Sequence, residues 1–142
     1  MFHVSDNEQV YVIHADEKNG IKAERFGKIA FAVIDEKTAF NAENSAQFDK
    51  IIASVQQSRD NTLVLDLVYT DISISQMQKA GISALVVFAN HIPEIFASLN
   101  VKIGIPFSVS GMAIFIATDL QNLQKSTPAK LLLWNFMKPQ IG

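Results

Sequence analysis

The 142-residue sequence contains no cysteine. This excludes disulfide bonds, thiolate metal ligands and cysteine nucleophiles, and it fits a reducing compartment. The first residues show no basic segment followed by an apolar one, so no signal peptide is predicted. The longest uncharged apolar stretch, GIPFSVSGMAIFIAT, is too short to span a bilayer and contains turn residues. We therefore predict a soluble, cytoplasmic protein without membrane contact.

Clustered positive charge is also missing. Twelve Lys and Arg stand against fourteen Asp and Glu, which gives a formal net charge of −2, and the basic residues are scattered. Direct binding to a phosphate backbone usually requires a basic stripe or domain, because Lys and Arg must displace counterions. We therefore expect no direct nucleic-acid binding, although folding could still assemble a local basic patch.

Hydrophobic residues, by contrast, make up 49% of the chain. A chain of this length and composition is typical of one globular domain with a buried core. We predict a single domain over residues 1–142, with an N-terminal strand or extension over 1–27 and an α/β core over 28–138.

Short β-prone runs alternate with helical patterns through this core. Such alternation predicts an α/β fold, a three-layer sandwich with a mainly parallel sheet of about four core strands and helices on both faces. EQVYVIHA adds an N-terminal strand or hairpin, which could extend the sheet edge or pair with a partner. The strand-like runs are KIAFAVI (28–34), TLVLDLV (62–68), SALVVFA (83–89) and MAIFIAT (112–118), and KIGIPFSV (102–109) is either a hairpin partner of the last run or a separate strand.

The first and last helices are predicted from their caps and apolar stripes. Ser45 is the expected N-cap of the first, whose stripe consists of Phe48, Ile51, Ile52 and Val55. Shorter helices are expected over SISQMQKAG, ending at Gly81, and after Pro93. Ser126 or Thr127 caps the last helix. Its inward-facing residues are expected to be Leu131, Leu132, Trp134 and Met137, with an exposed partner anchor as the alternative for Trp134.

Acidic residues follow or end several predicted strands, where ligand sites form in parallel sheets. Asp35, Asp66 and Asp119 could together bind a divalent cation, because hard cations prefer oxygen ligands. The favoured interpretation is structural: Asp35 is a loop residue, Asp66 a strand residue facing solvent or hydrogen-bonded locally, and Asp119 an N-cap or turn residue. We accordingly predict no metal and no cofactor. His91 precedes a helix and is interpreted as a cap or surface residue.

The order of four segments resembles the uracil-DNA glycosylase superfamily, and within it the non-catalytic psi subunits of bacterial DNA polymerase III. FAVIDE is similar to the first core strand and water-activating loop of that family, and FDKIIASVQQSRDNTLVLDLV to its helix and base-reading strand. ISALVVFANHIPEIF resembles its third strand and following helix. IFIATDLQNLQKSTPAKLLLW resembles the segment that opens with a catalytic His-Pro-Ser and closes with a Lys-rich helix bearing a late Trp.

The residues at the three motif positions depart from that family. Asp35 could supply the acid of the first motif, but its neighbours supply neither the Gly nor the Pro. Asp66 stands in place of the base-reading Asn, and an ionised carboxylate cannot donate the amide hydrogen bond. Asp119 replaces the catalytic His, and its charge would repel a developing anion. The resemblance therefore implies a degenerate, non-catalytic site.

We predict a protein-protein adaptor that is not an enzyme, an accessory subunit in DNA replication or repair. Its partners would be proteins, replisome components among them, and homo-oligomerisation stays open. Candidate partner-binding residues are Tyr11, Val12 and Trp134. The alternative is a small-molecule or metal-dependent enzyme that uses the acidic strand ends.

Overall fold

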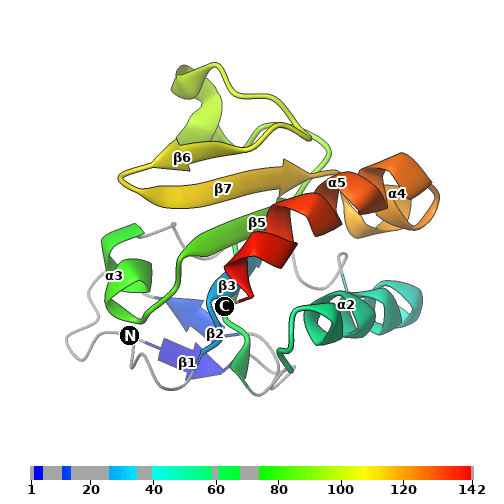
Figure 1. Cartoon of the computed structure of the whole chain (residues 1–142), viewed down its shortest axis with the longest axis horizontal. Coiled ribbons are helices and arrows are strands. Elements are labelled where there is room, and N and C mark those ends of the chain that lie inside the picture. The colour runs from blue at the N-terminus through cyan, green and yellow to red at the C-terminus, as the bar shows by residue number, and fades with distance from the viewer. Residues whose placement is uncertain are drawn as a thin grey trace.

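Five strands form the central sheet of the computed structural model, which describes residues 2–4, 11–13, 26–34, 40–58, 61–67 and 74–141. Along the sheet the strand order is β4-β3-β5-β7-β6, and all neighbours are parallel except β6 and β7. The predicted α/β class with a mainly parallel sheet is therefore confirmed (Figure 1). The strands are β3 (Ile29–Val33), β4 (Val64–Asp66), β5 (Ala84–Phe88), β6 (Phe107–Val109) and β7 (Met112–Ala117).

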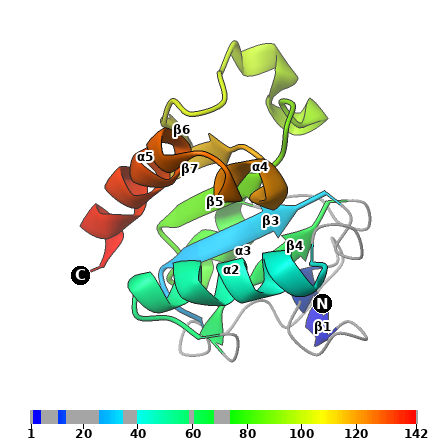
Figure 2. The ribbon, with the colours of Figure 1, turned by 90° about the vertical axis from the view of Figure 1, so that its right-hand side faces the viewer.

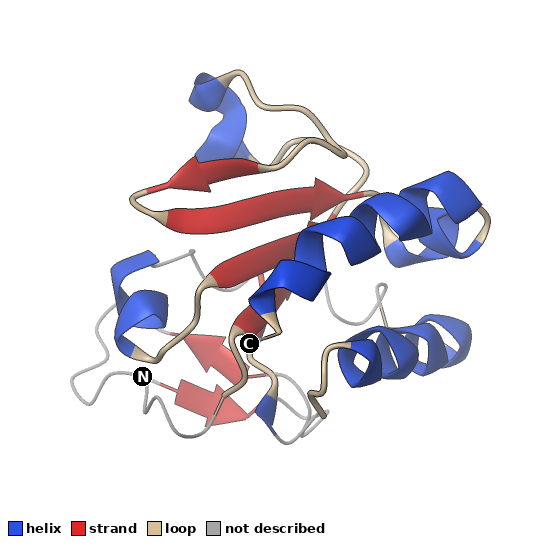
Figure 3. Ribbon diagram, in the orientation of Figure 1, coloured by secondary structure: helices blue, strands red, loops and turns tan. Residues whose placement is uncertain are grey.

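Helices cover both faces of this sheet (Figures 2 and 3). On β3, Ile29, Phe31 and Val33 join the core on one face, whereas Ala30 and Ala32 join the core on the other. This alternation follows from the period of two in a strand, and every β3 position is apolar because both faces are covered. The first face packs against α2 (Ala42–Ser54), α4 (Leu120–Gln124) and α5 (Thr127–Met137), and the second against α3 (Ile74–Lys79) and the 3₁₀ helix η3 (Glu94–Leu99).

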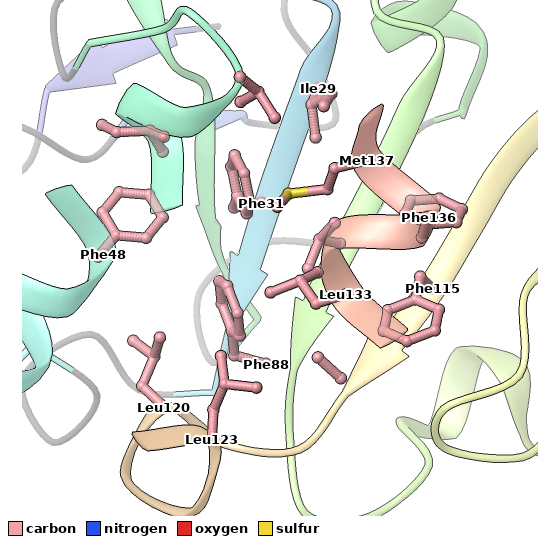
Figure 4. Close-up of a cluster of buried hydrophobic side chains, with 14 of the residues drawn as sticks. Ile29, Phe31, Phe48, Phe88, Phe115, Leu120, Leu123, Leu133, Phe136 and Met137 are labelled. Carbon is pink, nitrogen blue, oxygen red and sulfur yellow. The ribbon is translucent and has the colours of Figure 1, made fainter. Parts of the chain in front are cut away.

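Aromatic rings fill the core beneath α2 (Figure 4). The Phe31 ring lies edge-on to Phe48, with centroids 5.2 Å apart, and stacks on Phe88 at 5.7 Å. Phe115 and Phe136 form a second stacked pair, between β7 and α5. These pairs join the sheet to α2 and α5.

The N-terminal region forms a separate two-stranded antiparallel sheet of β1 (Phe2–Val4) and β2 (Tyr11–Ile13). This confirms the predicted hairpin, with a shorter second strand than EQVYVIHA suggested. The expectation that this strand extends the main sheet is wrong, since β2 lies near β4 but has no place in the five-stranded sheet.

The N-cap predicted for α2 is wrong by four residues. Asn41 is the cap, and its side chain accepts a hydrogen bond from the Asn44 backbone N at 2.9 Å. Ser45 lies inside the first turn, where its hydroxyl donates to the Phe40 carbonyl at 3.4 Å. Asn caps as well as Ser does, so the helix begins at the earlier of two competent caps.

The last two strands form a hairpin, which was one of the two alternatives. Ser110 and Gly111 both have positive φ, 51° and 86°, as a type I′ turn requires. Beyond β7, the short helix α4 was not predicted, because the polar stretch after Asp119 shows little apolar periodicity. Ser126 caps α5 as expected and accepts a hydrogen bond from the Ala129 backbone N at 3.2 Å. The C-terminal segment closes with the 3₁₀ helix η4 (Lys138–Gln140).

Helix α5 is rotated relative to the prediction. Leu133, Phe136 and Met137 are its buried residues. Leu131, Leu132 and Trp134, which were expected inside, are 57%, 48% and 36% exposed. The four consecutive apolar residues Leu-Leu-Leu-Trp point in different directions around the helix axis, so sequence periodicity cannot show which of them are buried. The packing of α5 against β7 determines the buried face.

Candidate functional site

The three acidic positions do not form one cluster. Asp66 ends β4 and Asp119 follows β7, and strands β3 and β5 lie between them. Three strand spacings correspond to roughly 14 Å, too far for two carboxylates to share a cation. Asp35 lies outside the described residues. Among those that the structure describes, no group of three or more His, Asp or Glu side chains could hold a metal ion.

Asp119 has a local structural role. One carboxylate oxygen accepts a hydrogen bond from the Asn122 backbone N at 2.8 Å, and the other accepts from the Asn122 side-chain amide at 3.1 Å. The carboxylate therefore caps α4, as the structural interpretation predicted. Asp66 is fully buried, so the expectation that it faces solvent is wrong, whereas a local hydrogen bond agrees with its burial.

A small cavity of about 240 Å³ opens at the carboxyl ends of β3, β5 and β7. Strand order reverses between β3 and β5, and ligands of open parallel sheets bind at such a point. Its walls include Asp119 and His91, and the His91 ring lies 2.9 Å from the Asn90 side-chain oxygen. The lining residues are Ile34, Asn44, Phe88, Ala89, Asn90, His91, Asp119, Leu120 and Gln121.

Asn44 is the unexpected residue of this cavity. It is only 4% exposed, and its Oδ1 accepts a hydrogen bond from the Gln124 side-chain amide at 2.7 Å. Asn44 lines the cavity wall, and its side-chain NH2 group is a hydrogen-bond donor. The sequence analysis did not single out this residue, because an Asn in the first turn of a helix is ordinarily solvated.

A larger groove of about 660 Å³ runs between α2 and α5. Trp134, the single tryptophan of the chain, lines it together with Ile51, Leu133 and Met137. Lys50 on α2 and Lys130 on α5 also border it, with Glu43 near the start of α2. The groove thus combines apolar side chains with a charged rim.

An apolar surface continues from this groove across α5. A Cβ placed on Gly104 would lie 3.8 Å from Leu132 Cδ1, so the loop before β6 packs beside α5. Two isoleucines of that loop are 38% and 56% exposed. We call the following residues the α5 surface: Ile103, Ile105, Leu131, Leu132 and Trp134.

Charge is distributed unevenly along the chain. Residues 120–142 contain Lys125, Lys130 and Lys138 and no acidic residue, which gives them a net charge of +3. The first 119 residues hold the other nine basic residues and all fourteen acidic ones, which gives −5 and accounts for the total of −2. The segment that contains α5 is thus basic, although the chain as a whole is acidic.

For the N-terminal candidates Tyr11 and Val12, the structure describes the backbone position. In the β1–β2 sheet, Tyr11 is paired with Val4 and Val12 with His3. The small sheet is therefore distinct from the α5 surface in both sequence and topology.

Within the described ranges, no helix has the length and apolar character needed to cross a membrane. No protein-family model matches this sequence, and no curated protein matches it. Any function must therefore be argued from the α5 surface, the groove and the cavity.

Proposed function

We propose that this protein is a non-catalytic adaptor that binds another protein through the α5 surface. The observation that carries the proposal is the outward orientation of Leu131, Leu132 and Trp134, three large apolar side chains on the exposed side of α5. Exposed apolar patches of this kind mark interaction sites. Tryptophan is also the residue type most enriched among binding hot spots.

The sequence resemblance to polymerase psi subunits agrees with this proposal and suggests replisome proteins as partners. In that view the protein acts in the cytoplasm, needs no cofactor and does not bind nucleic acid directly. Asp119, at the position of the family's catalytic His, is engaged by Asn122 as a helix cap, which favours a structural over a catalytic role. Tyr11 and Val12 remain a second candidate contact, available for pairing with a partner strand.

Replacing both Leu131 and Leu132 by Glu is expected to reduce recovery of the native partner at least tenfold. Two buried carboxylates without counter-charges would oppose an apolar interface. The measurement is affinity capture of the tagged protein from its native lysate, quantified by mass spectrometry. Replisome proteins in stoichiometric amount are expected with the unaltered chain. Tyr11→Ala with Val12→Ala, in a separate variant, measures the N-terminal contribution.

Ile95→Glu is the matched control, because Ile95 is 49% exposed on η3, which packs on the opposite face of the sheet. Both charge variants should melt at the temperature of the unaltered protein, since none of the changed side chains is buried. Equal recovery from all variants, or an equal loss with Ile95→Glu, would contradict binding through the α5 surface.

A second candidate function is favoured by one observation, the cavity at the carboxyl ends of β3, β5 and β7, where the strand order reverses. We propose as the alternative that this cavity binds a small molecule, as a carrier or an enzyme would. The side-chain amides of Asn44 and Asn90 in its wall carry donors, so they would suit a compact ligand with a carbonyl acceptor, and the Asp119 carboxylate disfavours an anion.

A melting screen of small neutral amides, together with calcium, magnesium and manganese, examines this alternative. A ligand present at a hundred times its Kd stabilises the folded state by about 2.7 kcal/mol, a readily measured rise in Tm. We expect the rise to disappear in His91→Ala, whose exposed side chain lines the cavity. If every compound and cation leaves Tm unchanged, the cavity has no such role.

A further inference from the structure

The shape of the groove between α2 and α5 indicates what kind of structure could bind in it. The groove lies between two helices on the same face of the sheet, α2 with 13 residues and α5 with 11. Both helices contact α4, and the groove between them can accept the side-chain ridge of a third helix. Burying an amphipathic helix in an apolar groove is a recurring mode of peptide recognition. The shape therefore suits a helix.

The charged residues at the rim of the groove indicate which residue types should flank the apolar stripe of a bound helix. Lys50 borders the groove on the α2 side and Lys130 on the α5 side, and both are exposed. Glu43 is the acidic residue among the lining residues, and it lies at the amino end of α2. A helix whose apolar stripe is flanked by Asp or Glu would meet a lysine on either side.

The same charges argue against a second copy of this chain as the occupant. A two-fold interface brings the same surface of both copies together, so a basic face would meet a basic face. Among the lining residues, Glu43 offsets only one of the two lysines, Lys50 and Lys130, so a net repulsion between two copies remains. A negatively charged membrane would match the lysines, but a flat bilayer leaves a groove of about 660 Å³ unfilled.

We propose that the α2–α5 groove binds an amphipathic helix of the partner protein, with acidic residues flanking its apolar stripe. This inference rests on the proposed adaptor function and names the chemistry of the partner at that surface. Trp134 would be covered by the bound helix, and Lys50 and Lys130 would face its acidic flanks.

Two synthetic peptides serve as probes of the groove in the full chain. Each has about 16 residues, slightly more than α2, with leucines at i, i+3, i+4 and i+7. Glutamate flanks the stripe in one peptide and lysine in the other. Trp134 is the single tryptophan, so its fluorescence reports burial directly. We expect the glutamate peptide to shift its emission to the blue and to bind at least about tenfold more tightly than the lysine peptide.

Charge reversal provides the decisive comparison. In Lys50→Glu with Lys130→Glu, the preference between the two peptides should invert. Lys79→Glu is the matched control, since this exposed lysine ends α3 on the opposite face of the sheet and should leave the preference unchanged. The same pair of reversals should lower recovery of the native partner at least about tenfold, because two rim charges change sign.

Several outcomes would overturn the inference. Equal binding of both peptides, or no response of Trp134 to either, would exclude an acidic helix. A dimer in light scattering that Trp134→Glu dissociates would identify a second copy as the occupant, because Trp134 lines the groove. A blue shift with phosphatidylserine vesicles alone would identify a membrane. If Leu131→Glu with Leu132→Glu abolishes partner recovery but the lysine reversals do not, the adaptor function stands and the acidic helix is wrong.

Discussion

Phe31→Ala is expected to lower the free energy of unfolding by about 3–5 kcal/mol, the range for truncating a buried aromatic residue. Phe31 is fully buried in the centre of β3 and contacts both Phe48 of α2 and Phe88 of β5 through ring pairs. Removing its ring leaves a cavity that the sheet cannot close, because β3 is held by parallel partners on both edges. Urea unfolding followed by circular dichroism measures the change.

Leu131→Ala is the comparison for Phe31→Ala. It removes a large apolar side chain from the same protein, but one that is exposed, so we expect a change within about 0.5 kcal/mol. The slope of the unfolding transition should be the same in both variants, as required for comparing midpoints. A loss below about 1 kcal/mol in Phe31→Ala would show that the aromatic core relaxes around the vacancy.

Gln57→Ala is expected to cost about 2 kcal/mol, a large effect for a side chain that is not fully buried. The Gln57 amide binds the backbone of Ile29 as a neighbouring strand would. Its Oε1 accepts from the Ile29 N at 3.1 Å, and its Nε2 donates to the Ile29 carbonyl at 3.0 Å. The Nε2 also donates to the buried Thr62 hydroxyl at 3.0 Å, which in turn donates to the Ser58 carbonyl at 2.6 Å. Truncation removes these partners from the Ile29 backbone N–H and carbonyl at the start of β3 and one of the two hydrogen bonds of the Thr62 hydroxyl.

Two control variants separate hydrogen bonding from packing at this site. Gln57→Met keeps the length of the side chain and removes its amide, so it should lose most of the same stability. Gln121→Ala removes an exposed glutamine and should be neutral. Gly27 has to stay small, because a Cβ there would overlap the Gln57 side chain, and Gly27→Ala should therefore resemble Gln57→Ala. If Gln57→Met is as stable as the unaltered chain, the amide contacts contribute little and the prediction is wrong.

Local patterns were sufficient for most of the fold. Continuous apolar runs such as KIAFAVI and SALVVFA identified β3 and β5, because strands of a parallel sheet are covered on both faces. The sequence also indicated Ser126 and Asp119 as cap candidates. A capping side-chain oxygen accepts a hydrogen bond from a backbone N–H only three residues further along the chain, so the pattern is local. The start of α2 was missed because Asn41 and Ser45 are both competent caps and the sequence does not rank them.

The candidate sites were harder to predict from the sequence, because each is formed by segments that only folding brings together. Trp134 was named as a partner-binding candidate, but the sequence favoured burial for it, and its 36% exposure follows from the rotation of α5. The groove needs α2 and α5 side by side, although some seventy residues separate them along the chain. Asn44 is held at the cavity only because Gln124, eighty positions later, donates a hydrogen bond to its side-chain oxygen.

The sequence by itself determined the α/β class, the cap of α5 and the positive charge of the C-terminal segment, because each depends on neighbours in the chain or on composition. The tertiary structure alone decided the strand order, the wide separation of Asp66 from Asp119 and the face that α5 turns to solvent. An apolar run indicates that a segment can be buried. Where more than one face of a helix is apolar, the sequence does not show which face packs against the core. The packing of α5 on β7 buries Leu133 and Phe136 and leaves Leu131, Leu132 and Trp134 exposed.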